Sequence, residues 1–361
     1  MAEALKNQYF TNKSIQKFAD EISKEYSGFD DKKFLKLVYS KNWKAKELKE
    51  KMYHVTNCLY ATLPKDYLTA LETLIKIAPR IKGFEAMVLP DYVETYGMGY
   101  WDKSLAALKE FTKYSSSEFA IRPFIIADVK KAMKYMFQLA SADNEHVRRF
   151  ASEGCRPRLP WAMALPNLKK DPSAIIPILE KLKNDESEYV RRSVSNNLND
   201  ISKDNPGVVL DLCEKWYGKT KNTDWIVKHA CRSLLKSGNK KALLIFGFGD
   251  TKNLEIETLK LDKTTVKIDS DLQFSFKLLN NDKKPAKIRL EYCMYFIKAN
   301  RKLSGKIFQI SEKQYKTGEY TIKKKHSFKN RTTRKHYAGK HKISIVVNGV
   351  EQKEMMFDLC L

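Results

Sequence analysis

The chain has 361 residues and a formal charge of +24, from 67 Lys and Arg against 43 Asp and Glu. This length suffices for two domains with buried cores. The charge suggests a polyanionic partner, with nucleic acid favoured over an anionic membrane surface; the alternative is that the basic composition serves only solubility. No apolar run is long enough for a membrane span, and the first residues do not form an apolar leader, so we expect a cytoplasmic protein. The six cysteines and six histidines lack metal-site spacing, so we expect the cysteines to be reduced and the protein to hold no metal or cofactor.

Residues 1–246 are expected to form a helical domain. Apolar residues recur three and four positions apart in runs such as 34–38, 68–75 and 175–182, and Pro or Gly residues separate these runs. The pattern of the first domain is therefore that of many short amphipathic helices.

A ten-residue stretch occurs twice, as EHVRRFASEG at 145–154 and as EYVRRSVSNN at 188–197. The offset of 43 residues is typical of HEAT or armadillo repeats, which stack paired helices into a curved solenoid. A weaker third copy at 224–229 includes Lys228. Each strong copy brings an arginine pair at the same position of its helix, which predicts a repeated basic face.

The stretch at 149–161 continues the first copy through a proline-rich loop. The expected helix ends at Gly154, and the next one is expected to open at Pro160 and Trp161. Glu153 then lies in the last helical turn, where the helix dipole disfavours an acid. The nearby arginines Arg149, Arg156 and Arg158 could hold it as a structural ion pair, or the acid could serve chemistry.

Residues 251–361 change to alternating β-branched and aromatic runs. Seven strands are expected at 264–268, 272–278, 288–297, 307–310, 320–322, 343–347 and 355–359, with a hairpin at Asn348-Gly349. This number of strands suggests an immunoglobulin-like sandwich, with a small barrel as the alternative. The predicted fold is therefore a mostly α solenoid followed by a small all-β domain.

The segment 323–342 holds nine Lys or Arg and no acid. Such a segment suits a phosphate or minor-groove contact, although a solvated edge strand would have the same composition. The candidate contacts are Lys323, Lys324, Lys325, Arg331, Arg334 and Lys335.

Three long strings carry a family resemblance: EFAIRPF at 118–124, the stretch from 145 to 161, and YVRRSVSNNLNDISKD at 189–204. They resemble the AlkC group of bacterial DNA alkylation-repair glycosylases, which belongs with the AlkD group to the HEAT-like-repeat glycosylases. The resemblance covers roughly residues 110–245. The β domain matches in kind, since some members carry a C-terminal immunoglobulin-like domain.

The resemblance implies base excision repair of cationic alkylated bases in double-stranded DNA, chiefly 3-methyladenine and possibly 3-methylcytosine, without base flipping. A cationic base is already a good leaving group, so the enzyme needs mainly to stabilise an oxocarbenium-like sugar and to place a water, which a carboxylate can do. We further expect a monofunctional, monomeric enzyme in the bacterial cytoplasm, associated with the nucleoid when it binds DNA.

The family's motif places acids at Glu118, Glu153 and Asp200 and an aromatic side chain at Trp161. The carboxylates are expected to flank the deoxyribose, although Glu118 could equally be structural. Trp161 is expected to contact the lesion nucleotide, with a core tryptophan as the alternative. The expected phosphate ligands of the helical domain are Arg122, Arg149, Arg156, Arg158, Arg192 and Lys228, whereas Arg148 and Arg191 should face elsewhere.

A second hypothesis needs no chemistry. A solenoid with this basic face could be a non-catalytic scaffold that binds nucleic acid or an acidic protein. The carboxylates embedded among the arginines argue against it, because a phosphate-binding face gains nothing from them.

Overall fold

The computed structural model describes residues 8–40, 42–330 and 335–361. The chain forms two compact units, one comprising Met1–Val209 with Gly218–Ala230, the other comprising Leu210–Tyr217 with Cys231–Leu361. The second unit thus joins the last helices to the strands. The domain boundary predicted between residues 246 and 251 follows the change from helices to strands, not this division into compact units, and it remains a prediction.

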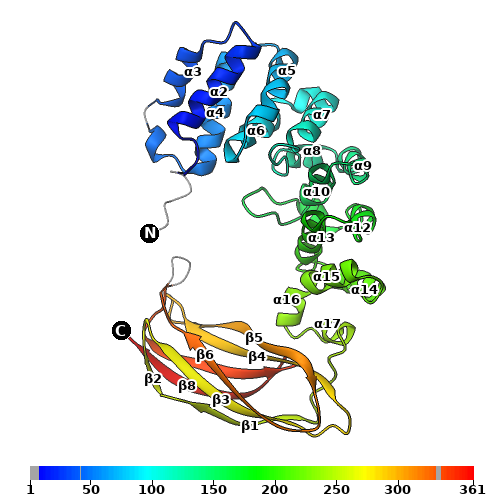
Figure 1. Cartoon of the computed structure of the whole chain (residues 1–361), viewed down its shortest axis with the longest axis vertical. Coiled ribbons are helices and arrows are strands. Elements are labelled where there is room, and N and C mark those ends of the chain that lie inside the picture. Colours follow the sequence, from blue (N-terminus) through cyan, green and yellow to red (C-terminus); the bar gives the residue numbers. More distant parts are fainter. Residues whose placement is uncertain (1–7, 41, 331–334) are drawn as a thin grey trace. The chain divides into compact units, whose positions relative to one another are not determined.

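The first unit is built of short helices, with a long loop at residues 154–165 (Figure 1). The α-helices are α2 (Asn12–Glu25), α3 (Asp31–Val38), α4 (Leu48–Thr62), α5 (Tyr67–Ile77), α6 (Val88–Tyr96), α7 (Trp101–Phe111), α8 (Arg122–Ala127), α9 (Val129–Leu139), α10 (Glu145–Glu153), α11 (Pro166–Lys170), α12 (Ile176–Leu182), α13 (Glu188–Ile201) and α15 (Lys221–Ala230). The 3₁₀ turns are η1 (Trp43–Ala45), η2 (Ala78–Arg80), η3 (Phe84–Met87) and η4 (Met98–Tyr100). Helix α14 (Pro206–Trp216) runs across the division between the units.

The repeat predicted from the doubled motif is present. Helices α10 and α13 carry its two copies and pack side by side, and α15, the weaker third copy, packs on α13. Helix α12 contacts both α10 and α13 from the other layer. The apolar positions of each copy, such as Val147 and Val190, are fully buried between the layers.

The first arginine of each pair has a structural role. Arg148 donates to the carbonyl oxygens of residues 142 and 143, and Arg191 donates to those of residues 185 and 186, at the same sequence offsets. Each arginine therefore secures the turn that leads into its own helix. The expectation that Arg148 and Arg191 face away from the second arginines is confirmed.

The second unit contains α16 (Arg232–Lys236), α17 (Lys240–Ile245) and a two-sheet sandwich. The strands are β1 (Leu254–Leu261), β2 (Thr265–Lys267), β3 (Asp271–Asn280), β4 (Ala286–Ile297), β5 (Leu303–Tyr315), β6 (Gly318–Ser327), β7 (Gly339–Val347) and β8 (Val350–Cys360). One sheet has the order β1-β3-β6 and the other β2-β8-β7-β4-β5. Alternate residues such as Phe274, Phe276 and Ile345 fill the core between them.

The sandwich confirms the immunoglobulin-like prediction and corrects one detail. Strand β1 was not predicted, because a register shift between Ile256 and Leu259 interrupts its alternation of buried and exposed residues. The predicted hairpin is present. Asn348 and Gly349 both adopt positive φ, 44° and 78°, as the two-residue turn between β7 and β8 requires.

Candidate active site

Five side chains form an alternating row of acids and arginines, the acid–arginine cluster: Glu118, Arg149, Glu153, Arg156 and Asp200. Arg149 bridges the first two acids, with Nη1 2.7 Å from Glu118 Oε2 and Nη2 3.5 Å from Glu153 Oε1. Arg156 bridges the next two, with Nη1 2.6 Å from Glu153 Oε1 and Nη2 2.9 Å from Asp200 Oδ2. The structure thus brings together all three predicted carboxylates.

The repeat positions these groups. Arg149 and Glu153 lie one turn apart on α10, and Glu153 is the last residue of that helix, as expected. Asp200 comes from the last turn of α13, which packs against α10. The helix dipole disfavours an acid at a C-terminus, and the two arginines that flank Glu153 offset this cost.

Burial strengthens the pairing in the cluster. Glu153 and Asp200 are only 5% and 3% exposed. Burial opposes the charge of Arg149, but the Glu118 and Glu153 carboxylates outweigh it and raise the pKa of the guanidinium above its ordinary value. For Arg156, Glu153 and Asp200 outweigh burial and raise the pKa in the same way. Both guanidinium groups therefore stay charged at any physiological pH and keep their positions between the acids.

Trp161 is exposed on a loop next to this cluster. Its side chain is 61% exposed, and its backbone has a left-handed φ of 65°. The expectation of a helix opening at Pro160 and Trp161 is wrong, because α11 begins only at Pro166. The alternative of a core tryptophan is also wrong, and an exposed indole at this place is available to a ligand.

Arg122 fixes the base of this loop. Its guanidinium donates to the carbonyl oxygens of Gly154, Arg156 and Met163, at 3.2, 2.9 and 2.5 Å. The side chain is fully buried, and this burial lowers the pKa of the guanidinium to about 10. The prediction that Arg122 binds phosphate is wrong for this geometry, because the group is inaccessible and holds backbone oxygens instead.

Comparisons with known proteins match the chain over its full length. A family model described as the C-terminal Ig-like domain of the uncharacterised protein YhaZ matches residues 255–361. The uncharacterised protein YhaZ of Bacillus subtilis (strain 168) is 42% identical over 98% of this chain and 99% of its own. A solved structure of the alkylpurine DNA glycosylase AlkC of Pseudomonas fluorescens, bound to DNA containing an abasic-site analogue, is 37% identical to this chain. It covers 99% of this chain and 100% of its own, with a TM-score of 0.95.

The chain belongs to the AlkC family. The match to the AlkC structure covers 99% of the chain, so it includes both the helical unit and the immunoglobulin-like domain. The resemblance inferred from the three sequence strings is therefore confirmed for the whole chain.

The remaining arginines predicted to bind DNA divide into buried and accessible groups in this AlkC-family chain. Arg149 and Arg156 are mostly buried and paired within the cluster, so their accessible charge is small. Arg192 is 64% exposed, with its guanidinium 2.6 Å from Glu188, and Arg158 is 37% exposed, with two bonds to Asp204. Lys228 is exposed on α15.

The basic segment of the β domain is split between two faces. Lys323, Lys324 and Lys325 are exposed on β6, an edge strand. Lys324 pairs with the inward-facing Phe274, whereas Lys323 and Lys325 point to the outer face, where Lys325 also contacts Asp271 at 3.0 Å. A lysine that points inward on an edge strand discourages pairing with another sheet. Arg331 and Arg334 lie outside the described residues, and Lys335 is exposed.

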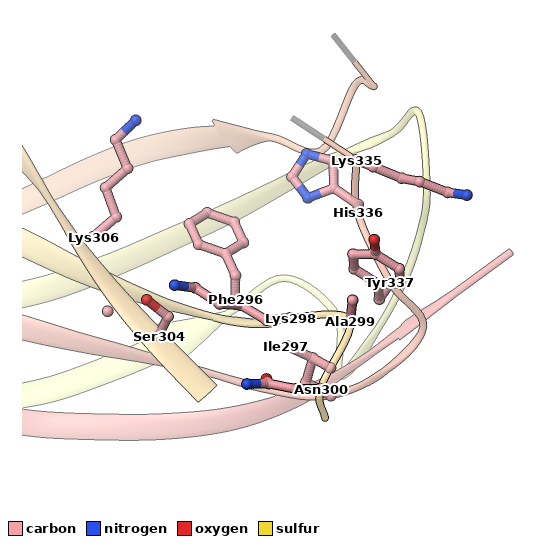
Figure 2. Close-up of a pocket in the computed structure, with 11 residues that line it drawn as sticks. Phe296, Ile297, Lys298, Ala299, Asn300, Ser304, Lys306, Lys335, His336 and Tyr337 are labelled. Carbon is pink, nitrogen blue, oxygen red and sulfur yellow. The ribbon is translucent and has the colours of Figure 1, made fainter. Parts of the chain in front are cut away.

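A hollow of about 630 Å³ opens beside the β4–β5 turn (Figure 2). Its lining includes Phe296 and Tyr337 and the lysines Lys298, Lys306 and Lys335. The described residues that line it include no Asp or Glu, so the hollow offers no carboxylate to stabilise a cationic sugar. The three predicted carboxylates lie instead in the acid–arginine cluster of this AlkC-family chain.

Sequence reasoning missed the groups that complete the cluster. Ser193 donates to Glu153 Oε2 at 2.6 Å, the ring of Tyr189 lies 4.7 Å from the Arg149 guanidinium carbon, and Lys203 Nζ lies 3.0 Å from Asp200 Oδ1. Ser193 replaces the buried Phe150 of the first copy, and Tyr189 replaces His146. These differences between the two copies were the signal that could have found both residues.

No helix in the described part of the chain is long and apolar enough to cross a bilayer. Among those same residues, no group of three or more His, Cys, Asp or Glu side chains is placed to hold a metal ion.

Proposed function

We propose that this chain is a monomeric, monofunctional DNA glycosylase that hydrolyses the N-glycosidic bond of cationic alkylated bases in double-stranded DNA. The substrate class is 3-methyladenine and, second, 3-methylcytosine. The observation that carries the proposal is the acid–arginine cluster, together with an exposed tryptophan on the loop that follows α10. The relative with the same architecture is an alkylpurine DNA glycosylase whose structure was solved bound to DNA containing an abasic-site analogue.

The carboxylates supply the chemistry. Cleavage moves the bonding electrons onto the base, so a cationic 3-methyladenine leaves as a neutral molecule and positive charge develops on the sugar. A carboxylate beside C1′ stabilises that charge, and a second one accepts a proton from the water that attacks C1′. We assign these roles to Glu153 and Asp200, with Glu118 nearby. The proposal does not divide the two roles between Glu153 and Asp200.

The arginines preorganise the acids for the reaction. Arg149 and Arg156 hold the carboxylates in a fixed orientation before substrate binds, so little reorganisation is required during the reaction. The exposed indole of Trp161 then meets the lesion nucleotide, where an aromatic face favours positive charge on the base or sugar. We propose, as the family resemblance implies, that the lesion reacts without being flipped into a pocket.

Accessible cations hold the DNA. Arg192, Arg158 and Lys228 are the proposed phosphate ligands of the helical unit, and Lys323, Lys325 and Lys335 are those of the β domain. This assignment implies action on the bacterial chromosome in the cytoplasm.

The test is release of free base from methylated duplex DNA in the presence of EDTA. We expect 3-methyladenine to appear well above the rate of spontaneous loss, and to leave an intact abasic strand. DNA that is bound tightly but loses no base above the spontaneous rate would support the scaffold hypothesis instead.

A further inference from the structure

Trp161 has a backbone conformation that its own side chain does not stabilise. A bulky residue at φ 65° is uncommon and persists only when its surroundings hold it. The indole is 61% exposed, so packing of the ring contributes little. The hydrogen bonds of the loop backbone must therefore hold this residue in place.

Two cations from distant helices hold that backbone. Arg122 binds three carbonyl oxygens of the loop, as described above. Lys49, in the first turn of α4 and 112 residues earlier in the chain, donates from Nζ to the Trp161 carbonyl oxygen at 2.8 Å. This is the bond that acts on Trp161 itself.

Lys49 also reaches the segment that carries the first acid of the cluster. Its Nζ lies 4.7 Å from the centroid of the Phe119 ring, and Phe119 follows Glu118 in the chain. One ammonium group therefore contacts both the Trp161 loop and the turn of Glu118. A fixed distance between these two segments is what a lesion held between Trp161 and the carboxylates requires.

Two acids on α6 lie near Lys49. Asp91 and Glu94 both interact electrostatically with Lys49. Asp91 is buried and accepts a hydrogen bond from Thr56 at 2.5 Å. Helices α4 and α6 pack together, so Lys49 on α4 and the two acids on α6 are held in one arrangement next to the loop.

We propose that Lys49 is a positioning residue for Trp161, and that the N-terminal helices take part in lesion recognition through it. The proposal rests on the proposed glycosylase function. Lys49 does not touch the reacting atoms; it fixes the backbone from which the indole projects. It also gives helix α4 a role that its sequence did not suggest.

The test compares Lys49→Met, which keeps most of the stem and removes the donor, with Lys49→Arg and with the control Lys44→Met. Lys44 is exposed in the neighbouring turn η1, so its change removes the same charge. We expect Lys49→Met to slow single-turnover base release about 10- to 100-fold, the range for a misplaced catalytic contact. Affinity for undamaged DNA should stay within about twofold of that of Lys44→Met, and Lys49→Arg should recover most of the rate.

A double mutant separates positioning from other roles. In a Trp161→Ala background, Lys49→Met should have no further effect on the rate, because the side chain that it positions is gone. A rate for Lys49→Met equal to that of Lys44→Met would overturn the proposal. So would an additive effect in the Trp161→Ala background, or a lower salt dependence of DNA binding, which would make Lys49 a phosphate ligand.

A separate readout does not depend on glycosylase activity. Acrylamide quenching of the Trp161 emission, taken as the difference between the parent and its Trp161→Phe variant, should change on Lys49→Met and not on Lys44→Met. An unchanged quenching constant overturns the proposal. A changed constant in a protein that releases no base supports the positioning contact while it refutes the proposed function.

Discussion

Replacing Glu153 by Gln should abolish most of the activity and weaken the fold. Both carboxylate oxygens are in use, one with Arg156 at 2.6 Å and Arg149 at 3.5 Å, the other with Ser193 at 2.6 Å. An amide removes the negative charge between two buried arginines and turns an NH₂ donor toward another donor. Loss of one preorganised electrostatic contact typically costs about 10²- to 10³-fold in rate. Loss of one partner of a buried ion pair costs about 3 kcal/mol of unfolding free energy.

The assay is single-turnover release of base from methylated DNA, with thermal unfolding measured on the same samples. Glu188→Gln is the matched control, because Glu188 is a helical glutamate that is 58% exposed and pairs at the surface with Arg192. We expect Glu188→Gln to keep the parent rate within a few fold. A folded, DNA-binding Glu153→Gln variant with nearly the parent rate would refute the catalytic role of the cluster.

Three further changes test the structure around the site. Gly154→Ala should destabilise the fold by about 1–3 kcal/mol in chemical denaturation, because the new Cβ would lie 2.8 Å from both Ile121 Cγ2 and Met136 Cε. The control Gly207→Ala should not destabilise the fold, because its Cβ would meet no atom within 4 Å. Burial and Asp91 raise the pKa of Glu94 from 4.5 to about 7, so the folded protein keeps this proton at pH values where the unfolded chain has lost it, and the stability falls as the pH rises through this range. Glu94→Gln should therefore raise the unfolding free energy by about 1–3 kcal/mol at pH 8 and little at pH 4, and equal effects at both pH values would refute this reasoning. The double variant Lys323→Gln/Lys325→Gln should lower the slope of log DNA affinity against log salt concentration by up to about 2, whereas Lys324→Gln should leave this slope nearly unchanged. A larger change of the slope in Lys324→Gln than in the double variant would show that the inward-pointing lysine binds the DNA.

The helical repeat and the position of Glu153 at a helix end could be predicted because they depend on local sequence, whereas Glu118 and Asp200 were assigned through the family resemblance. The 43-residue offset placed α10 and α13 side by side, and the C-terminal position of Glu153 followed from the helix that ends there. The alternation of residues likewise gave the sandwich, except where the shift in β1 hid a strand.

The loop from 154 to 165 could not be predicted, because its conformation depends on distant side chains. Pro160 and Trp161 look like a helix start, yet Arg122 and Lys49 hold this segment open through its carbonyl oxygens. The same contacts explain why Arg122 was misassigned. An arginine among motif residues resembles a phosphate ligand until the structure shows its guanidinium fully buried.

The pairing within the cluster also escaped sequence reasoning in part. Arginines near Glu153 were expected to pair with it, but the order of acids and arginines across three segments depends on how α10 and α13 pack. Ser193 contacts Glu153 only because the second copy has a small polar residue where the first has Phe150.

The most direct test of the account is a time course on a duplex with a single 3-methyladenine or a stable cationic analogue, followed for free base and for the abasic strand together. The account predicts that both appear at one rate, well above spontaneous loss, and that Asp200→Asn reduces this rate by orders of magnitude while binding is retained. Tight binding with no release by the parent protein, or an undiminished rate in Asp200→Asn, would contradict it.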